Sequence, residues 1–91
     1  MNLEGKSCIV TGAASGIGKA IATRFASAGG KVAIADLNLE NARQAADDIS
    51  AAFGTPTLAI AMDVTIEEQV NAGLAQVVET WGGVDVLVSN A

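Results

Sequence analysis

A glycine-rich segment near the start of the chain could bind a phosphate group. It reads TGAASGIG over residues 11–18 and lies between a short apolar run and a helical pattern. Backbone amides at the start of a helix lack partners within the helix, and the helix dipole adds partial positive charge there. Glycines permit the tight turn and the close approach of a phosphate. We expect five residues to hold a pyrophosphate, although a plain turn is the simpler interpretation of the loop alone: Gly12, Ser15, Gly16, Ile17 and Gly18.

An acidic residue, Asp36, ends the second apolar run. A carboxylate at this point can accept hydrogen bonds from the ribose hydroxyls of an adenosine. Its negative charge would repel the 2′-phosphate that distinguishes NADP from NAD. No basic residue lies beside it, because Leu37 and Asn38 follow, and Ser15 in the glycine loop is not basic either. The two motifs together predict NAD as cofactor, whereas Asp36 alone could simply begin a turn.

Two other nucleotide-binding classes fit this segment less well. A nucleoside-triphosphatase phosphate loop requires G-x-x-x-x-G-K-[ST]. Gly18 and Lys19 are present, but Ala13 replaces the first glycine and Ala20 replaces the hydroxyl that would bind magnesium. A methyltransferase usually carries an acidic residue near the start of its loop, and none is found there.

The elements that must position these residues alternate along the chain. Four short apolar runs, rich in β-branched residues, indicate strands over residues 7–11, 31–36, 57–62 and 84–89. The runs are mostly continuous, which is typical of parallel strands buried on both faces. Helical periodicity occupies the intervals and predicts helices over about 16–28, 39–52 and 66–80.

Local signals mark the ends of these helices. Asn38 is placed to cap the second helix. Thr65 and Glu68 form a capping-box pattern at the start of the third. Glycines follow all three helices and can adopt the left-handed conformation that ends a helix. The apolar stripe predicted for the first helix consists of Ile17, Ile21, Phe25 and Ala28, and those of the others include Phe53 and Val78.

This alternation predicts an α/β fold with a parallel sheet and right-handed crossovers. With the glycine loop after the first strand, we expect a Rossmann-type sheet of order 3-2-1-4 with helices on both faces. A cofactor would lie across the carboxyl ends of the strands, at the switch point between the first and fourth strands. We expect residues 1–91 to form a single, incomplete dinucleotide-binding half-domain, because a whole doubly wound domain would continue with further strands.

Composition narrows the classes of function. The chain is 51% hydrophobic and 16% charged, too apolar for a disordered segment. Its net charge of -5, without a basic stripe, argues against a nucleic-acid partner. No apolar run approaches the roughly 20 residues of a membrane helix, so we expect a cytoplasmic protein. The single cysteine, Cys8, is expected in the core, and the lack of histidine removes a common metal ligand.

Taken together, these motifs resemble the short-chain dehydrogenase/reductase family. The family's TGxxxGxG loop is matched by Thr11, Gly12, Gly16 and Gly18, and its NAD-selecting acid by Asp36. Further matches are Asp63-Val64 after the third strand and Asn90-Ala91 after the fourth, where Ser89 replaces an Asn found in many members. The resemblance spans essentially the whole chain, and within the family it is nearest to the bacterial 3-hydroxybutyrate dehydrogenases.

The resemblance implies further roles. Asp63 and Val64 would bind the adenine, and Asn90 would lie near the nicotinamide, although Asp63 could be only a turn residue and Asn90 only structural. The family's catalytic Ser, Tyr and Lys lie beyond residue 91, so no catalytic residue is expected within this chain. The implied activity is reversible hydride transfer between NAD and a small secondary alcohol or ketone, in a homo-oligomeric enzyme. These 91 residues alone are expected to be inactive.

Overall fold

The sheet is parallel throughout. A computed structural model describes residues 1–90 and contains the strands β1 (Ser7–Thr11), β2 (Lys31–Asp36), β3 (Thr57–Ala61) and β4 (Val86–Val88). Their order is β3-β2-β1-β4, as predicted. The register pairs Val10 of β1 with Ile34 of β2 and Val88 of β4. All four carboxyl ends therefore reach the same edge of the sheet.

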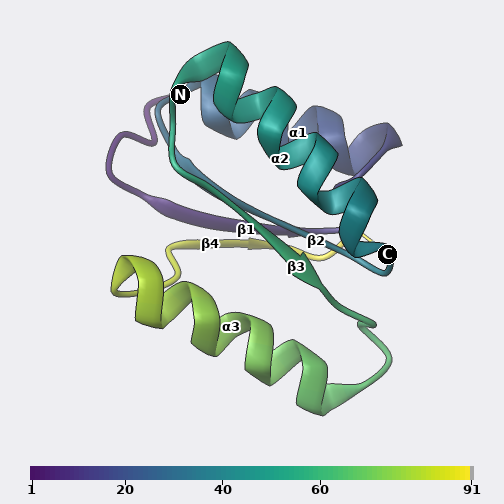
Figure 1. Cartoon of the computed structure of the whole chain (residues 1–91). Helices are drawn as coiled ribbons and strands as arrows, with labels where there is room; N and C mark the ends of the chain where they lie inside the picture. The colour runs from purple at the N-terminus through teal and green to yellow at the C-terminus, as the bar shows by residue number, and fades with distance from the viewer. Residues whose placement is uncertain (91) are drawn as a thin grey trace.

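Three helices cover the two faces of this sheet. They are α1 (Gly16–Ser27), α2 (Leu39–Phe53) and α3 (Glu67–Trp81). Figure 1 shows α1 and α2 on one face and α3 on the other. This is the arrangement expected when each crossover between parallel strands is right-handed and the chain reverses its winding direction after β3.

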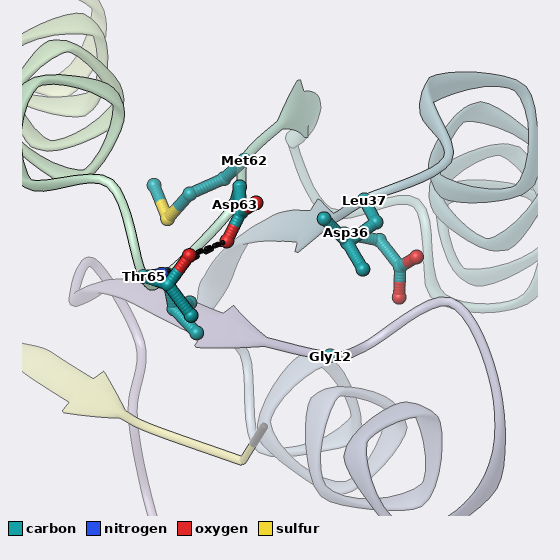
Figure 2. A pocket seen from close by; sticks show the side chains of 7 residues that line it. Gly12, Asp36, Leu37, Met62, Asp63 and Thr65 are labelled. Atoms are coloured by element: carbon teal, nitrogen blue, oxygen red, sulfur yellow. Dashed lines mark hydrogen bonds between the residues drawn. The ribbon is translucent and has the colours of Figure 1, made fainter.

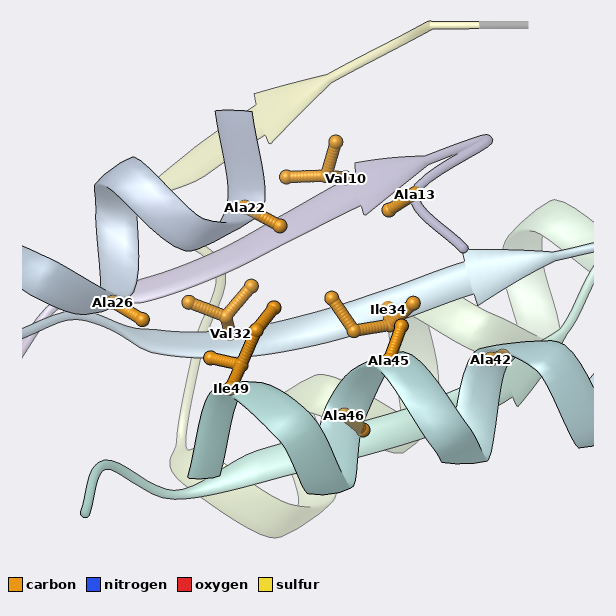
Figure 3. Close-up of a cluster of buried hydrophobic side chains, with 10 residues drawn as sticks. All are labelled: Val10, Ala13, Ala22, Ala26, Val32, Ile34, Ala42, Ala45, Ala46 and Ile49. Atoms are coloured by element: carbon orange, nitrogen blue, oxygen red, sulfur yellow. The ribbon is translucent and has the colours of Figure 1, made fainter. Parts of the chain in front are cut away.

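The main core lies between the sheet and the helices α1 and α2 (Figure 3). Val32 and Ile34 of β2 point into it, and α1 contributes mainly alanines. A second core, with Ile9 and Val77, lies between the sheet and α3. Small side chains let the helices approach the sheet closely, which suits a chain with only 3% aromatic residues.

The apolar stripe predicted for α1 is confirmed only in part, because Ile21 and Phe25 pack against the core but are not its most buried residues. Gly18, Ala22 and Ala26 are the buried residues, whereas Ile17 is 74% exposed. The prediction weighted the largest apolar side chains, but the close approach of α1 to the sheet requires the smallest. Phe53 and Val78, predicted in the stripes of the other two helices, are also exposed.

The predicted start of α2 is confirmed, whereas that of α3 differs. The side chain of Asn38 accepts a hydrogen bond from the Asn41 amide at 3.0 Å, which caps α2. The capping box of Thr65 and Glu68 was wrong, because α3 has no side-chain cap and begins after Ile66. The Thr65 hydroxyl donates instead to Asp63.

Burial is uneven across the sheet. Every residue of β1 is buried, and β2 is buried except at its two ends, as predicted for strands covered on both faces. The prediction was wrong for β3 and β4, which remain partly open, and Leu87 on β4 is 55% exposed.

Within residues 1–90, no helix has both the length and the apolarity needed to span a membrane.

Candidate functional site

The glycine loop is fixed by backbone packing. A Cβ atom on Gly12 would collide with the carbonyl oxygen of Asn90. One on Gly18 would collide with the carbonyl oxygen of Gly12 and would lie 2.7 Å from Nδ2 of Asn90. Two of the predicted glycines are therefore needed because the start of α1, the end of β1 and the segment after β4 meet there.

Hydrogen bonds complete this junction. The Asn90 amide donates to the Thr11 hydroxyl at 2.9 Å, and that hydroxyl lies 3.4 Å from the Val88 carbonyl. The Asn90 side chain donates to the Gly12 carbonyl at 3.4 Å. Asn90 thus positions the loop through both its backbone and its side chain.

The start of α1 is open to solvent. Gly16 has φ +60°, a conformation that favours glycine, and no atom lies within 4 Å of where its Cβ would be. Ser15 is the N-cap residue, but its side chain makes no capping hydrogen bond. Ser15 and Ile17 are both exposed. The unpaired amides of the first helical turn therefore face space that an anion could enter.

Asp36 ties the glycine loop to the end of β2. One carboxylate oxygen accepts a hydrogen bond from the Ala14 amide, and the other accepts one from the Asn38 amide, both at 3.2 Å. The Ala13 amide adds a bond to the Ala35 carbonyl at 3.3 Å. The carboxylate thus lies beside the loop, within reach of any group bound there.

A second turn follows β3 at the same edge of the sheet. Oδ1 of Asp63 accepts hydrogen bonds from the Thr65 amide at 2.9 Å and from the Thr65 hydroxyl at 2.6 Å. These two bonds hold the pKa of Asp63 below its usual range, and the bond from the hydroxyl has the larger effect. The Asp63 amide in turn donates to the side chain of Gln69 in α3 at 2.8 Å.

A cavity of about 300 Å³ joins the two regions. Figure 2 shows Asp36 at the end of β2 with Leu37 next to it on one side, Asp63 and Thr65 after β3 on the other, and Gly12 at the base. Met62 and Val64 complete the lining. No Lys or Arg is among the residues that line it, so its charge comes from the two carboxylates.

The structure therefore brings only part of the predicted site into one cavity. Gly12, Asp36, Asp63 and Val64 line it. The remaining predicted residues lie outside the lining, along the glycine loop and the end of β4: Ser15, Gly16, Ile17, Gly18 and Asn90. The cavity spans the ends of β1, β2 and β3, and the predicted switch point at β1 and β4 lies at the Gly12–Asn90 contact.

Sequence reasoning missed four residues around this cavity. Leu37, Met62 and Thr65 line it, and Gln69 holds the Asp63 turn. Met62 is buried because Gly73 of α3 leaves room for its methyl group. Their proximity to the recognised motifs was the available signal for the first three. Gln69 lies six residues from Asp63, and nothing in the sequence marks it.

Comparison with known proteins agrees with this geometry. A sorbitol dehydrogenase of Cereibacter sphaeroides is 44% identical over the whole chain, and a 7alpha-hydroxysteroid dehydrogenase of Escherichia coli is 40% identical. The chain covers 34% and 35% of these relatives, about a third of their length.

A solved structure is similar in fold as well. The L-sorbose reductase of Gluconobacter frateurii, in complex with NADPH and L-sorbose, superimposes with a TM-score of 0.96 and is 37% identical. The match covers 100% of this chain and 35% of that one. The family model described as short chain dehydrogenase matches residues 6–91. With the glycine loop, the sheet order and these matches in agreement, the chain belongs to the short-chain dehydrogenase family.

Proposed function

We propose that residues 1–91 are the NAD-binding half-domain of a dehydrogenase that transfers a hydride between NAD and a small secondary alcohol or ketone. One observation carries the proposal: the open helix start at Gly16 lies on the same loop that the Asp36 carboxylate holds. Amides for a pyrophosphate and a carboxylate for a ribose are thus adjacent.

Each part of the site suits one part of the cofactor. Gly12, Ser15, Gly16, Ile17 and Gly18 hold the pyrophosphate region. Beyond Asp36, the cavity suits the adenine. Its rim carries the apolar side chains of Leu37, which is 75% exposed, and Val64, and flat aromatic rings pack well on such groups. Asp63 supplies a hydrogen-bond acceptor beside them. Asn90 positions the nicotinamide side of the site.

The charge of the cavity favours NAD over NADP. Asp36 would oppose the additional phosphate of NADP, and no basic residue lines the cavity. Lys19 of α1 pairs with Asp48 of α2 at 3.2 Å, away from the lining residues. The L-sorbose reductase was solved with NADPH. Membership of the family therefore does not by itself select NAD, and we infer the cofactor from the charge of this cavity.

We infer that the substrate would be set by the part that the relatives have outside the matched third of their length. The relatives named above are a sorbitol dehydrogenase, a 7alpha-hydroxysteroid dehydrogenase and an L-sorbose reductase. We propose a small secondary alcohol or ketone, with 3-hydroxybutyrate and acetoacetate as the first pair to assay. The cofactor would supply the hydride chemistry, and this chain would orient it. The whole enzyme would act as a homo-oligomer, without nucleic acid or membrane as a partner.

Calorimetric titration of the 91-residue chain with NAD and, separately, with NADP tests the proposal. We expect saturable binding of NAD and much weaker binding of NADP. Asp36→Ala should weaken NAD binding about tenfold or more, because the ribose loses a charged hydrogen-bond acceptor and the loop loses its contact at Ala14. The same variant should also show a smaller difference in affinity between NAD and NADP.

Glu40→Ala is the matched control, because Glu40 is an exposed acid near Asp36 that does not line the cavity. A circular dichroism spectrum shows whether each protein is folded. Absence of NAD binding by a chain with a folded spectrum would contradict the proposal. A 3-hydroxybutyrate assay on the same sample should show no turnover, because the chain contains no Tyr that could serve as proton donor.

For the 91-residue chain on its own, the exposed β4 supports a second candidate, self-association. Within residues 1–90, β4 pairs only with β1, so its outer edge carries unpaired backbone groups beside the exposed Leu87. Such edges can pair with another chain. Size-exclusion chromatography at several concentrations would detect this association, and a monomer throughout would argue against it.

A further inference from the structure

The turn after β3 uses side chains in a way that its helix does not require. Thr65 lies directly before Ile66, the N-cap residue of α3, and α3 has no side-chain cap. Its hydroxyl donates to Oδ1 of Asp63 at 2.6 Å, and its amide donates to the same oxygen at 2.9 Å. Figure 2 shows this contact at the edge of the cavity.

This double hydrogen bond makes the two oxygens of Asp63 unequal. Oδ1 is occupied by two donors, whereas no hydrogen bond to Oδ2 is found among residues 1–90. Rotation of the carboxyl group would break both contacts with Thr65. The backbone that carries this carboxyl group is anchored as well, because the Asp63 amide donates to the side chain of Gln69 of α3 at 2.8 Å. A bound base would therefore meet one acceptor in one orientation.

We propose that Thr65 and Gln69 are positioning residues that hold Asp63 so that the cavity selects a purine with an exocyclic amino group. The inference rests on the proposed function and deepens it. An amino group donates to a carboxylate oxygen, whereas a carbonyl at the same place on the ring would oppose it. A carboxylate with fixed orientation discriminates between the two more strongly than a rotating one, because it loses less freedom on binding.

The test compares NAD with nicotinamide hypoxanthine dinucleotide, in which a carbonyl replaces the adenine amino group. Both are titrated into the wild-type chain and into Thr65→Val, which removes the hydroxyl but keeps the backbone amide. We expect the wild type to prefer NAD and Thr65→Val to lower that preference about threefold to tenfold, the range of one hydrogen bond. Thr65→Ser, which keeps the hydroxyl, should restore the wild-type ratio.

The pH dependence separates positioning from a loss of structure. Thr65→Val removes the first cause of the lowered pKa of Asp63, so this pKa rises. As the pH falls, NAD affinity should then decline at a higher pH in Thr65→Val than in the wild type. Asp36 across the cavity, and Glu67 and Glu68 in the first turn of α3, are carboxylic acids in both proteins, so the difference reports on Asp63.

Gln69 supplies a second, independent variant. Gln69→Ala removes the acceptor for the Asp63 amide and should lower the preference in the same direction, whereas Gln69→Glu keeps an acceptor and should retain it. If Thr65→Val and Gln69→Ala bind both dinucleotides with the wild-type ratio, the inference is overturned while the proposed function stands. If the folded wild type binds neither dinucleotide, the proposed function fails and the inference with it.

Discussion

The two sides of the cavity are held in different ways. On the glycine-loop side, backbone atoms of Gly12, Gly18 and Asn90 pack so closely that no Cβ fits at either glycine. On the other side, two exposed side chains hold the Asp63 turn: the Thr65 hydroxyl donates to the Asp63 carboxylate, and the Gln69 side chain accepts from the Asp63 amide. The first side is held by close packing within the fold, and the second is held by hydrogen bonds at the surface.

This difference separates stability from recognition. Interior packing cannot relax without moving the strands, so a change on the glycine-loop side affects folding and binding together. A change at an exposed hydrogen bond contributes little to stability, because water replaces the lost partner. We therefore expect variants of the Asp63 turn to change ligand selectivity in a protein that remains folded.

The largest effect is expected from Gly18→Ala. The added methyl group would collide with the Gly12 carbonyl and approach the Asn90 side chain, so the end of β1 and α1 must separate. Overpacking of this kind costs about 1–3 kcal/mol in the free energy of unfolding. Urea denaturation followed by circular dichroism measures this loss, and NAD titration should show weakened binding in the same variant.

Gly83→Ala is the matched control. No atom lies within 4 Å of its would-be Cβ, and its φ is not positive. Its free energy of unfolding should stay within about 0.5 kcal/mol of the wild type. Equal losses in the two variants would mean that the close contacts of Gly18 with Gly12 and Asn90 are not what constrains the loop.

A smaller effect is expected at Asn38, which lies between the two sides. Its side chain caps α2 by accepting from the Asn41 amide, so Asn38→Ala should lower the free energy of unfolding by about 1 kcal/mol. Asn38→Asp retains an acceptor and should recover most of this loss. Thermal or urea unfolding of the two variants checks the prediction.

Thr65→Val should have a smaller effect on the free energy of unfolding than Asn38→Ala, because Thr65 does not cap α3. A greater loss from Thr65→Val would contradict the contrast between the two sides.

The smallest signal is expected from chemical labelling of the Cys8 thiol on β1 in the folded protein. This residue is 0% exposed, and burial, followed by the charge of Asp85, raises the pKa of its thiol. Since the thiolate is the reactive form, iodoacetamide should scarcely modify the folded protein near neutral pH. In urea the pKa returns towards its ordinary value and the thiol is exposed, so labelling should appear. Mass spectrometry measures the modified fraction, and rapid labelling without urea would show that β1 opens readily.

Much of the fold was predictable from the sequence. Parallel pairing follows from the alternation of strands and helices. The strand order follows from the dinucleotide-binding fold that the motif of Gly12, Gly16 and Gly18 indicates. Periodicity did not reveal which face of α1 is buried, because the close approach to the sheet selects Gly18, Ala22 and Ala26 over the larger Ile17. Large apolar residues are a poor guide where the space between layers is narrow.

The candidate site was predictable in its motifs but not in its connections. Asp36 and Asp63 were recognised, yet the sequence does not show that the first holds Ala14 and the second is held by Thr65. The Thr65–Glu68 pattern suggested instead that Thr65 caps α3. A hydroxyl near a helix start can bond to the helix or to the preceding turn, and the nearby Asp63 carboxylate decided the outcome.

The Asn90–Thr11 hydrogen bond has a consequence for the order of folding. It joins residues 79 positions apart in the chain. Contacts of such long range form late, because closing a long loop costs entropy before the contact provides any stabilisation. The glycine loop leaves the ribosome before β4 does, but it reaches its final geometry only when β4 docks beside β1. A nascent chain that had not yet made β4 would therefore carry the complete phosphate-binding motif without the shape needed to bind.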